Sequence, residues 1–193
     1  CLLSVHKIKT RIKIIQYFMI NKGTKIIWFT GISGVGKTTL SNSFYKKFKK
    51  KFRIKRIDGD VFRKKNKTLN SFSKKNIIRN NKMIINYVDE IKQKYQIILV
   101  SVISPLAETR KLAKKRFKGN YFEIFVHCNI KSLIKRDVKK LYLKAREEKL
   151  NLIGFNSPIT YEKSTYNVIK LNTDKTTISR SIQKISNIIN VNY

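Results

Sequence analysis

Residues 31–38 combine glycines, a lysine and a threonine in a spacing typical of phosphate binding. The segment GISGVGKT fits the pattern G-x-x-x-x-G-K-[ST] at every defined position. Glycines let backbone N–H groups turn toward a phosphate, and the N-terminus of a following helix attracts the same anion. We therefore expect Lys37 to contact the β- and γ-phosphates of a nucleotide, and Thr38 to hold Mg²⁺ with its hydroxyl. The nucleotide-binding residues predicted in this segment are Gly31, Ser33, Gly34, Gly36, Lys37, Thr38 and Thr39.

Two aspartates, Asp58 and Asp60, come directly after the second predicted strand. The central strand predicted at residues 97–103 lacks the terminal acid that is typical of many P-loop proteins. The phosphate loop alone leaves GTPase, ATPase and small-molecule kinase open. An acid beside the second strand suits a kinase, because Asp60 could orient or deprotonate an acceptor hydroxyl, or hold Mg²⁺ through water. The alternative is an aspartate that only caps a helix or a turn.

The elements that must position these residues follow an alternating pattern. Short apolar or β-branched runs predict strands at residues 25–30, 52–57, 97–103, 121–128 and 168–171. Helical spacing or composition predicts helices at 38–51, 78–94, 106–117, 131–149 and 176–189, and Gly154 and Pro158 mark a loop at 151–161. The alternation predicts an α/β fold, a P-loop NTPase-type three-layer sandwich with a mostly parallel central sheet.

Composition bounds the class of protein. The chain of 193 residues suggests one domain, and no uninterrupted apolar run is long enough to cross a bilayer. The formal net charge of +33 indicates either attraction of polyanions such as ATP, sulfated nucleotides and nucleic acid, or compositional drift. Both interpretations stay open. Cys1 and Cys128 are too few for a disulfide framework, so we expect a cytoplasmic protein.

The first twenty residues are basic and contain no acid. A continuous apolar stretch with a small-residue cleavage site is not evident, which argues against a signal peptide. We expect residues 1–20 to be an N-terminal extension outside the fold, with Met19 as the natural start, and residues 21–193 to form the kinase domain. An organellar transit peptide has the same basic, acid-poor composition, so that alternative stays open.

Five motifs, in order, resemble the adenylylsulfate kinase family between about Lys25 and Ile185. They are GISGVGKTT at 31–39, DGD at 58–60 followed by Arg63, Phe72-Ser73 leading to Asn80, VSVISP at 100–105, and RDVKKLYLKAR at 136–146. The resemblance implies a kinase that moves the γ-phosphoryl group of ATP to the 3′-hydroxyl of adenylyl sulfate, for sulfate assimilation, with a mobile lid over its site.

Residue roles follow from the same resemblance. Asp60 would lie at the acceptor hydroxyl and the metal, together with Thr38 at the metal. Arg136 would stack on the ATP adenine, and Lys139, in the lid, would bridge donor and acceptor phosphates. The catalytic residues so implied are Asp60, Lys37 and Lys139. The acceptor-binding residues are Arg63, Phe72, Asn80, Ile103, Ser104 and Lys139.

The acceptor side also departs from the family pattern. The family usually has F-S-x-x-D-R-x-x-N, whereas Asn76 and Ile77 stand at the D-R positions, so the arginine expected on the acceptor's phosphosulfate is missing. Lys74, Lys75 or Lys82 could supply its charge, but lysine lacks the bidentate geometry of arginine. Leu152 replaces the family's second adenine-stacking phenylalanine, which could cost about 1–3 kcal/mol of binding. Val138 and Lys140 replace a proline and a glycine of the lid.

Three functions remain in view. The first is the adenylylsulfate kinase reaction. The second keeps the kinase and changes the acceptor, for example to a cytidine diphosphoramidate-type precursor of a surface polysaccharide, which would need neither missing side chain. The third is a basic nucleic-acid-binding protein, which is disfavoured because the phosphate loop is intact and the lysines are interpreted as scattered rather than clustered with aromatic residues. We expect a small-molecule nucleotide as partner and no membrane, and leave a homodimer open.

Overall fold

The computed structural model describes residues 23–66, 73–137, 140–147, 149–164, 166 and 168–191. The predicted extension at residues 1–20 lies outside the described residues, as do two predicted site residues, Phe72 and Lys139. Within the described part of the chain, the helices are all too short or too polar to cross a membrane.

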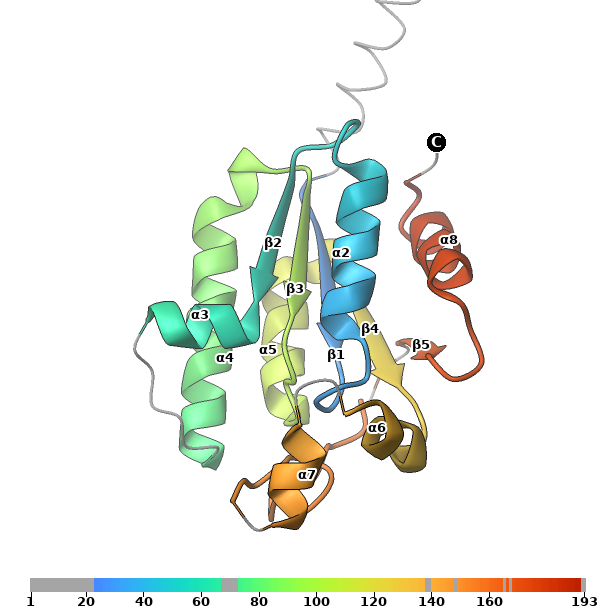
Figure 1. The fold of residues 1–193 in the computed structure, drawn as a ribbon. Helices are drawn as coiled ribbons and strands as arrows, with labels where there is room; N and C mark the ends of the chain where they lie inside the picture. Colours follow the sequence, from blue (N-terminus) through green and yellow to red (C-terminus); the bar gives the residue numbers. More distant parts are fainter. Residues whose placement is uncertain are drawn as a thin grey trace, which may run out of the picture.

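A five-stranded parallel sheet runs through the molecule (Figure 1). Its strands are β1 (Lys25–Thr30), β2 (Ile54–Asp58), β3 (Ile97–Ser101), β4 (Tyr121–His127) and β5 (Ile169–Asn172). Their order across the sheet is β2-β3-β1-β4-β5, and every pairing is parallel. This confirms the predicted α/β fold with a parallel sheet. The strand order places β1, which leads into the phosphate loop, at the centre.

Helices cover both faces of the sheet. One face carries α2 (Lys37–Phe48) and α8 (Ile178–Ile188), and the other carries α4 (Lys74–Ile91) and α5 (Ala107–Phe117). Successive residues of a strand point to opposite faces. Ile27 and Phe29 of β1 therefore join the apolar cluster of α2 and α8, while Ile26 and Trp28 join that of α4 and α5. Because both faces are covered, β1 and β3 are apolar and buried almost throughout.

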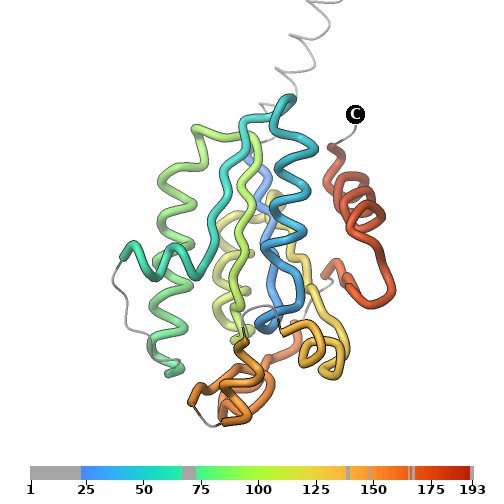
Figure 2. Tube along the Cα trace, in the orientation of Figure 1, coloured from blue at the N-terminus to red at the C-terminus, as the bar shows by residue number. Residues whose placement is uncertain are grey.

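Short elements gather at the carboxyl ends of the strands. The phosphate loop follows β1, α3 (Gly59–Lys65) follows β2, and α6 (Ile130–Arg136) follows β4. Figure 2 shows α6 and α7 (Leu141–Arg146), coloured gold to orange, at this same edge of the sheet. The short 3-10 helices η1 (Lys92–Lys94) and η2 (Lys118–Asn120) lie before β3 and β4 at the other edge. The carboxyl edge is where ligands bind in open parallel sheets.

The prediction of one helix at 131–149 is wrong. The chain forms α6 and α7 instead, and Asp137 ends the first helix and caps the second. Its carboxylate accepts hydrogen bonds from the backbone N–H groups of Tyr142 at 3.0 Å and Leu143 at 2.9 Å. Lys140 adopts a left-handed φ of 51°, which turns the chain between the helices. Helical composition could not reveal this break, because it depends on a side chain satisfying the N–H groups of the next helix.

Candidate active site

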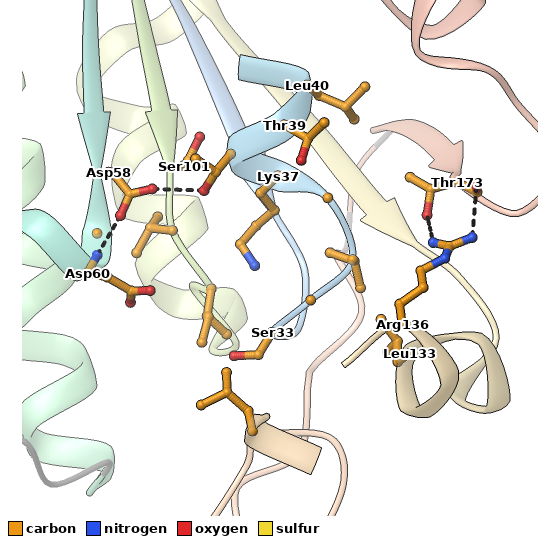
Figure 3. A pocket seen from close by; sticks show the side chains of 18 of the residues that line it. Ser33, Lys37, Thr39, Leu40, Asp58, Asp60, Ser101, Leu133, Arg136 and Thr173 are labelled. Carbon is orange, nitrogen blue, oxygen red and sulfur yellow. Dashed lines mark hydrogen bonds between the residues drawn. The ribbon is translucent and has the colours of Figure 1, made fainter. Parts of the chain in front are cut away.

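A cavity of about 400 Å³ lies at the carboxyl edge of the sheet. It is bounded by the phosphate loop, the start of α3, the end of β3, and parts of α6, α7 and α8 (Figure 3). The structure brings together here most of the site residues predicted from the sequence. Those that line the cavity are Ser33, Gly34, Gly36, Lys37, Thr38, Thr39, Asp60, Arg63, Ile103 and Arg136.

The glycines of the phosphate loop are required by its backbone. Gly34 and Gly36 have φ values of 79° and 99°, in the region that favours glycine. Gly31 has a φ of 139°, and a Cβ there would lie 2.1 Å from the carbonyl oxygen of Val126. Gly31 does not line the cavity; its role is to let the loop leave β1 in close contact with β4.

Lys37 is the first residue of α2 and is almost fully buried. Its Nζ donates a 2.7 Å hydrogen bond to the carbonyl oxygen of Ile32, so the side chain folds back across the loop. Figure 3 shows the Lys37 amine on the cavity side of α2, between Asp60 and Ser33. An ammonium group held over a helix N-terminus is well placed to bind phosphate, since loop and helix favour the same anion.

Asp58 is a site residue that the sequence analysis left without a role. Its Oδ2 accepts a 2.8 Å hydrogen bond from the Thr38 hydroxyl, which joins β2 to the phosphate loop. Its Oδ1 accepts hydrogen bonds from the N–H groups of Asp60 at 3.0 Å and Val61 at 3.3 Å, which caps α3. The DGD motif in the sequence offers two acids that could contact the phosphate loop. Which of them faces Thr38 depends on the register of β2 against β3.

Asp60 lies in the first turn of α3 and forms an ion pair with Arg63 one turn later. Both side chains line the cavity, across from the phosphate loop. The Asp60 side chain is half exposed, so water and ligands can reach its carboxylate. The pair brings a carboxylate and a guanidinium to one side of the cavity.

Arg136 forms the wall of the cavity near β5. Its guanidinium donates to the hydroxyl of Thr173 at 3.2 Å, to the Thr173 carbonyl at 3.4 Å and to Asp174 at 2.7 Å. The pKa of Asp174 is lowered, first by the hydrogen bond from the Asn129 backbone and further by Arg136. These contacts hold the guanidinium plane in place, as a stacking surface requires.

Tyr142, in the segment after α6, packs against the phosphate loop. Its hydroxyl donates a 2.8 Å hydrogen bond to the carbonyl oxygen of Ser33, and burial raises the pKa of this tyrosine to about 12. Burial alone would raise the pKa of Asp137, but the backbone N–H groups of Tyr142, Leu143 and Leu141 outweigh it and lower that pKa. Asp137 is therefore an ionised cap that fixes α7 above the loop.

Two predicted acceptor-binding residues lie outside the cavity lining. Ser104 is buried, accepts a 3.1 Å hydrogen bond from the Trp28 indole and donates to Asn81. Asn80 is also buried, and its Oδ1 has no hydrogen-bond partner among the described residues. The contacts of Ser104 are those of a residue that supports the end of β3, so its contact with substrate stays a prediction.

Ile77, at the position of the missing cation, is buried in a small apolar cluster with Leu106 and Ile153. Ile103, which lines the cavity, packs against the same cluster. Leu152, at the position of the missing aromatic ring, is buried instead in the cluster between the sheet, α2 and α8. Both departures are therefore packed apolar positions in this chain, and the loop after α7 contacts the start of α4 through Ile77 and Ile153.

A buried polar network fixes Tyr161 behind the phosphate loop. Arg110 and Glu123 are both buried, and their Nε and Oε1 atoms lie 3.2 Å apart. Arg110 also donates 2.6 Å to the Ser104 carbonyl and lies over the ring of Tyr161. The Tyr161 hydroxyl is 2.7 Å from the Thr30 hydroxyl, directly before the phosphate loop. Nothing in the residue spacing indicated this network, because its members are distant in sequence.

The chain is similar to known kinases. The adenylylsulphate kinase family matches residues 23–172. A probable adenylyl-sulfate kinase from Archaeoglobus fulgidus is 34% identical over 152 residues, 78% of this chain and 96% of that protein. An adenylyl-sulfate kinase from Halothermothrix orenii is 34% identical over 174 residues, 86% of this chain and 90% of that protein. The Mycobacterium tuberculosis APS kinase CysC, solved with AMPPNP and APS, is 28% identical with a TM-score of 0.77, covering 87% of this chain and 98% of that one.

Proposed function

The chain belongs to the adenylylsulphate kinase family, and on this premise we propose that it transfers the γ-phosphoryl group of ATP to the 3′-hydroxyl of adenylyl sulfate. The products are ADP and 3′-phosphoadenylyl sulfate. One observation carries this function: a single cavity is lined by residues 33–38 of the phosphate loop on one side and by Asp60, Arg63 and Ile103 on the other. A donor site and an acceptor site are thereby brought together, as in-line transfer requires.

The donor half would bind ATP. Backbone N–H groups of the loop and the N-terminus of α2 would hold the phosphates, and Lys37 would leave the Ile32 carbonyl to contact the β- and γ-phosphates. Arg136, held by Thr173 and Asp174, would stack on the adenine. Lys139 would supply further positive charge from the lid, which Tyr142 attaches to the loop.

The chemistry of the residues around Thr38 fits Mg²⁺. Mg²⁺ prefers oxygen ligands and is usually held by one or two carboxylates together with substrate phosphates. The Thr38 hydroxyl and the Asp58 carboxylate already lie within a 2.8 Å hydrogen bond, and Asp60 lines the same cavity. Thr38 would hold the ion directly, with Asp58 and Asp60 binding its water ligands. The ion would neutralise charge on the transferred phosphoryl group.

The acceptor half would orient the 3′-hydroxyl. Asp60 would accept a hydrogen bond from that hydroxyl, while Arg63 would bind the acceptor's anionic groups. Phe72 would stack on the acceptor base, and Asn80 would contribute its amide, whose Oδ1 has no partner among the described side chains. Each of these contacts is an expectation from motif position, supported by the placement of Asp60, Arg63 and Ile103 around one cavity.

A second acceptor is favoured by one specific observation. Ile77 is buried against Leu106 and Ile153, so this position of the acceptor side offers an apolar side chain in place of an arginine. An acceptor of the cytidine diphosphoramidate type, which would need neither the missing arginine nor the second aromatic ring, would fit such a surface. This candidate retains the donor half unchanged.

A coupled ADP-release assay tests both acceptors. The full chain with MgATP is offered adenylyl sulfate beside a panel of other nucleotide-linked anions, with Lys37→Ala as the inactive control. Turnover with adenylyl sulfate that Lys37→Ala abolishes is the expected result. Turnover only with another acceptor would replace the first candidate by the second, and ADP release that persists in Lys37→Ala would contradict the proposed donor site.

A further inference from the structure

The amino edge of the sheet carries a concentration of positive charge that phosphotransfer does not use. Eight of the eleven residues from Lys46 to Arg56 are lysine or arginine and none is acidic, against 44 in the 193 residues of the chain. This segment is the end of α2, the following turn and the start of β2. Figure 2 shows that turn at the opposite end of α2 from the phosphate loop. With 12 residues in α2, the separation is about 18 Å.

These charges surround a groove with aromatic walls, here called the basic groove. Its volume is about 550 Å³. The residues that line it are Tyr45, Lys49, Lys50, Lys51, Phe52, Arg53, Ile54, Tyr95 and Gln96. The interpretation of the lysines as scattered, made from the sequence, is therefore wrong for this segment.

The basic groove is held in a fixed shape by the paired starts of β2 and β3. The Gln96 backbone N–H donates to the Arg53 carbonyl at 2.9 Å, and the Arg53 N–H donates back to the Gln96 side chain at 2.9 Å. Cations lie over the rings, with Arg56 4.6 Å from the centre of Tyr45 and Lys55 5.9 Å from that of Tyr95. Charge and aromatic surface are thus presented together on a rigid strand edge.

The charge at this edge extends beyond the groove. The chain enters the sheet here, since β1 begins at Lys25, paired with Ile97 at the start of β3. Lys25 itself, and Lys92 and Lys94 of η1 before β3, lie at the same edge. The acid Asp89, at the end of α4, is already bound by Lys92 at 2.6 Å and Arg116 at 3.3 Å. Like charges gathered in this way attract an extended anionic partner.

We propose that the basic groove binds single-stranded nucleic acid, without sequence preference, through the phosphate backbone. The basic groove is an unfavourable site for a small phosphate ligand. It lies at the C-terminal end of α2, where the helix dipole favours cations rather than anions. A polymer gains from many separate contacts with lysine and arginine, each releasing a counterion. Aromatic side chains beside a basic groove are the usual surface on which single-stranded bases stack.

The test is fluorescence anisotropy of a labelled 20-nucleotide single strand of mixed sequence, titrated with the full chain at several salt concentrations. Affinity should fall as salt rises. The variant Lys49→Glu, Lys50→Glu, Lys51→Glu should weaken binding by about tenfold or more and reduce the salt dependence. The matched control, Lys111→Glu, Lys131→Glu, Lys163→Glu, changes the same charge at exposed positions elsewhere and should weaken binding by no more than about threefold.

Several results would overturn the proposal. An equal loss of affinity in the two variants would mean that the total charge of the protein, not the basic groove, attracts the nucleic acid. Displacement of the strand by excess MgATP would place it in the catalytic cavity. Binding to vesicles containing phosphatidylserine, with none to the strand, would make the partner a membrane surface. Circular dichroism checks that both variants fold, and the corresponding Lys→Gln triple replaces the first variant if it does not. The experiment uses no acceptor, so its outcome is independent of the proposed kinase reaction.

Discussion

Thr38 and Asp58 are joined by a 2.8 Å hydrogen bond between the threonine hydroxyl and Oδ2 of the carboxylate. This bond connects the end of the phosphate loop to the end of β2, across two neighbouring elements of the carboxyl edge. The other oxygen of Asp58 caps α3, the helix that carries Asp60 and Arg63. One side chain therefore sets the spacing between the donor and acceptor halves of the cavity.

Asp58→Asn should lower kcat by about 10²-fold, the scale of positioning groups, and should raise the Mg²⁺ concentration needed for half-maximal rate. The helix cap should survive, because asparagine also caps helices well, so the unfolding midpoint should change little. Steady-state rates measured against Mg²⁺ check this, with Asp89→Asn as a control acid far from the cavity. An unchanged Mg²⁺ requirement would show that Asp58 serves only as a cap.

Asp60→Asn should also lower kcat by about 10²-fold or more, but for a different reason: the amide no longer accepts the acceptor's proton. The affinity for ATP, measured by equilibrium binding, should stay close to that of the wild type, because Asp60 lies across the cavity from the phosphate loop. The ion pair with Arg63 is lost in this variant. Arg63→Gln is the control: it breaks the same pair and should raise the KM of the acceptor more than it lowers kcat.

Residue spacing predicted the conformation of the phosphate loop, because this loop is a continuous segment whose glycines are dictated by local backbone conformation. Gly34 and Gly36 have the positive φ values that their pattern implies. The strands were predicted to within two residues at every end, since buried strands are continuous apolar runs. Neither success depends on contacts between distant parts of the chain.

The features that were missed depend on such contacts. Asp58 faces Thr38 only because β2 and β3 pair in a particular register. The helix predicted at 131–149 is divided by an Asp137 cap that composition does not show. The motif gives Ser104 a predicted acceptor contact but does not indicate that its hydroxyl bonds to Trp28 and Asn81. Motif position specifies which residues surround a site, and the packing of neighbours decides which way they point.

Ile77→Arg introduces the residue expected from the family. We expect its main effect to be loss of fold stability rather than better acceptor binding. Ile77 is 7% exposed and packs against Leu106 and Ile153, so a guanidinium there would be buried without an arranged partner. A cost of about 2–4 kcal/mol is expected in urea unfolding. Ile77→Val, which keeps an apolar side chain, should cost about 0.5–1.5 kcal/mol. Full stability in Ile77→Arg would mean that the arginine reaches the cavity.

Glu123→Gln should be among the most destabilising single changes in the chain. It leaves the buried Arg110 guanidinium without its carboxylate, and breaking a buried pair in this way costs about 3–5 kcal/mol. The comparison is Asp89→Asn, which removes the partner of Arg116 at the surface and should cost at most about 1 kcal/mol. Urea unfolding of both variants checks the contrast. Similar small losses of unfolding free energy in the two variants would show that the hydrogen bonds of Arg110 to backbone carbonyls suffice to stabilise its buried charge.

Tyr161 should make the stability of the fold depend on alkaline pH. Burial, the largest cause, raises the pKa of its hydroxyl from 10.0 to about 12. Between pH 10 and pH 12 the unfolded chain loses the tyrosine proton while the folded chain keeps it. The contribution of this hydroxyl to the free energy of unfolding is therefore complete below pH 10 and is lost as pH rises to about 12.

Tyr161→Phe should cost about 1 kcal/mol at neutral pH, by removing the hydrogen bond to Thr30, and should flatten the fall in unfolding free energy above pH 10. Some slope should remain, because burial raises the pKa of Tyr142 to about 12 as well. Urea unfolding of wild type and variant across this pH range is the measurement, and two curves that stay parallel would show that Tyr161 ionises alike in the folded and unfolded chain.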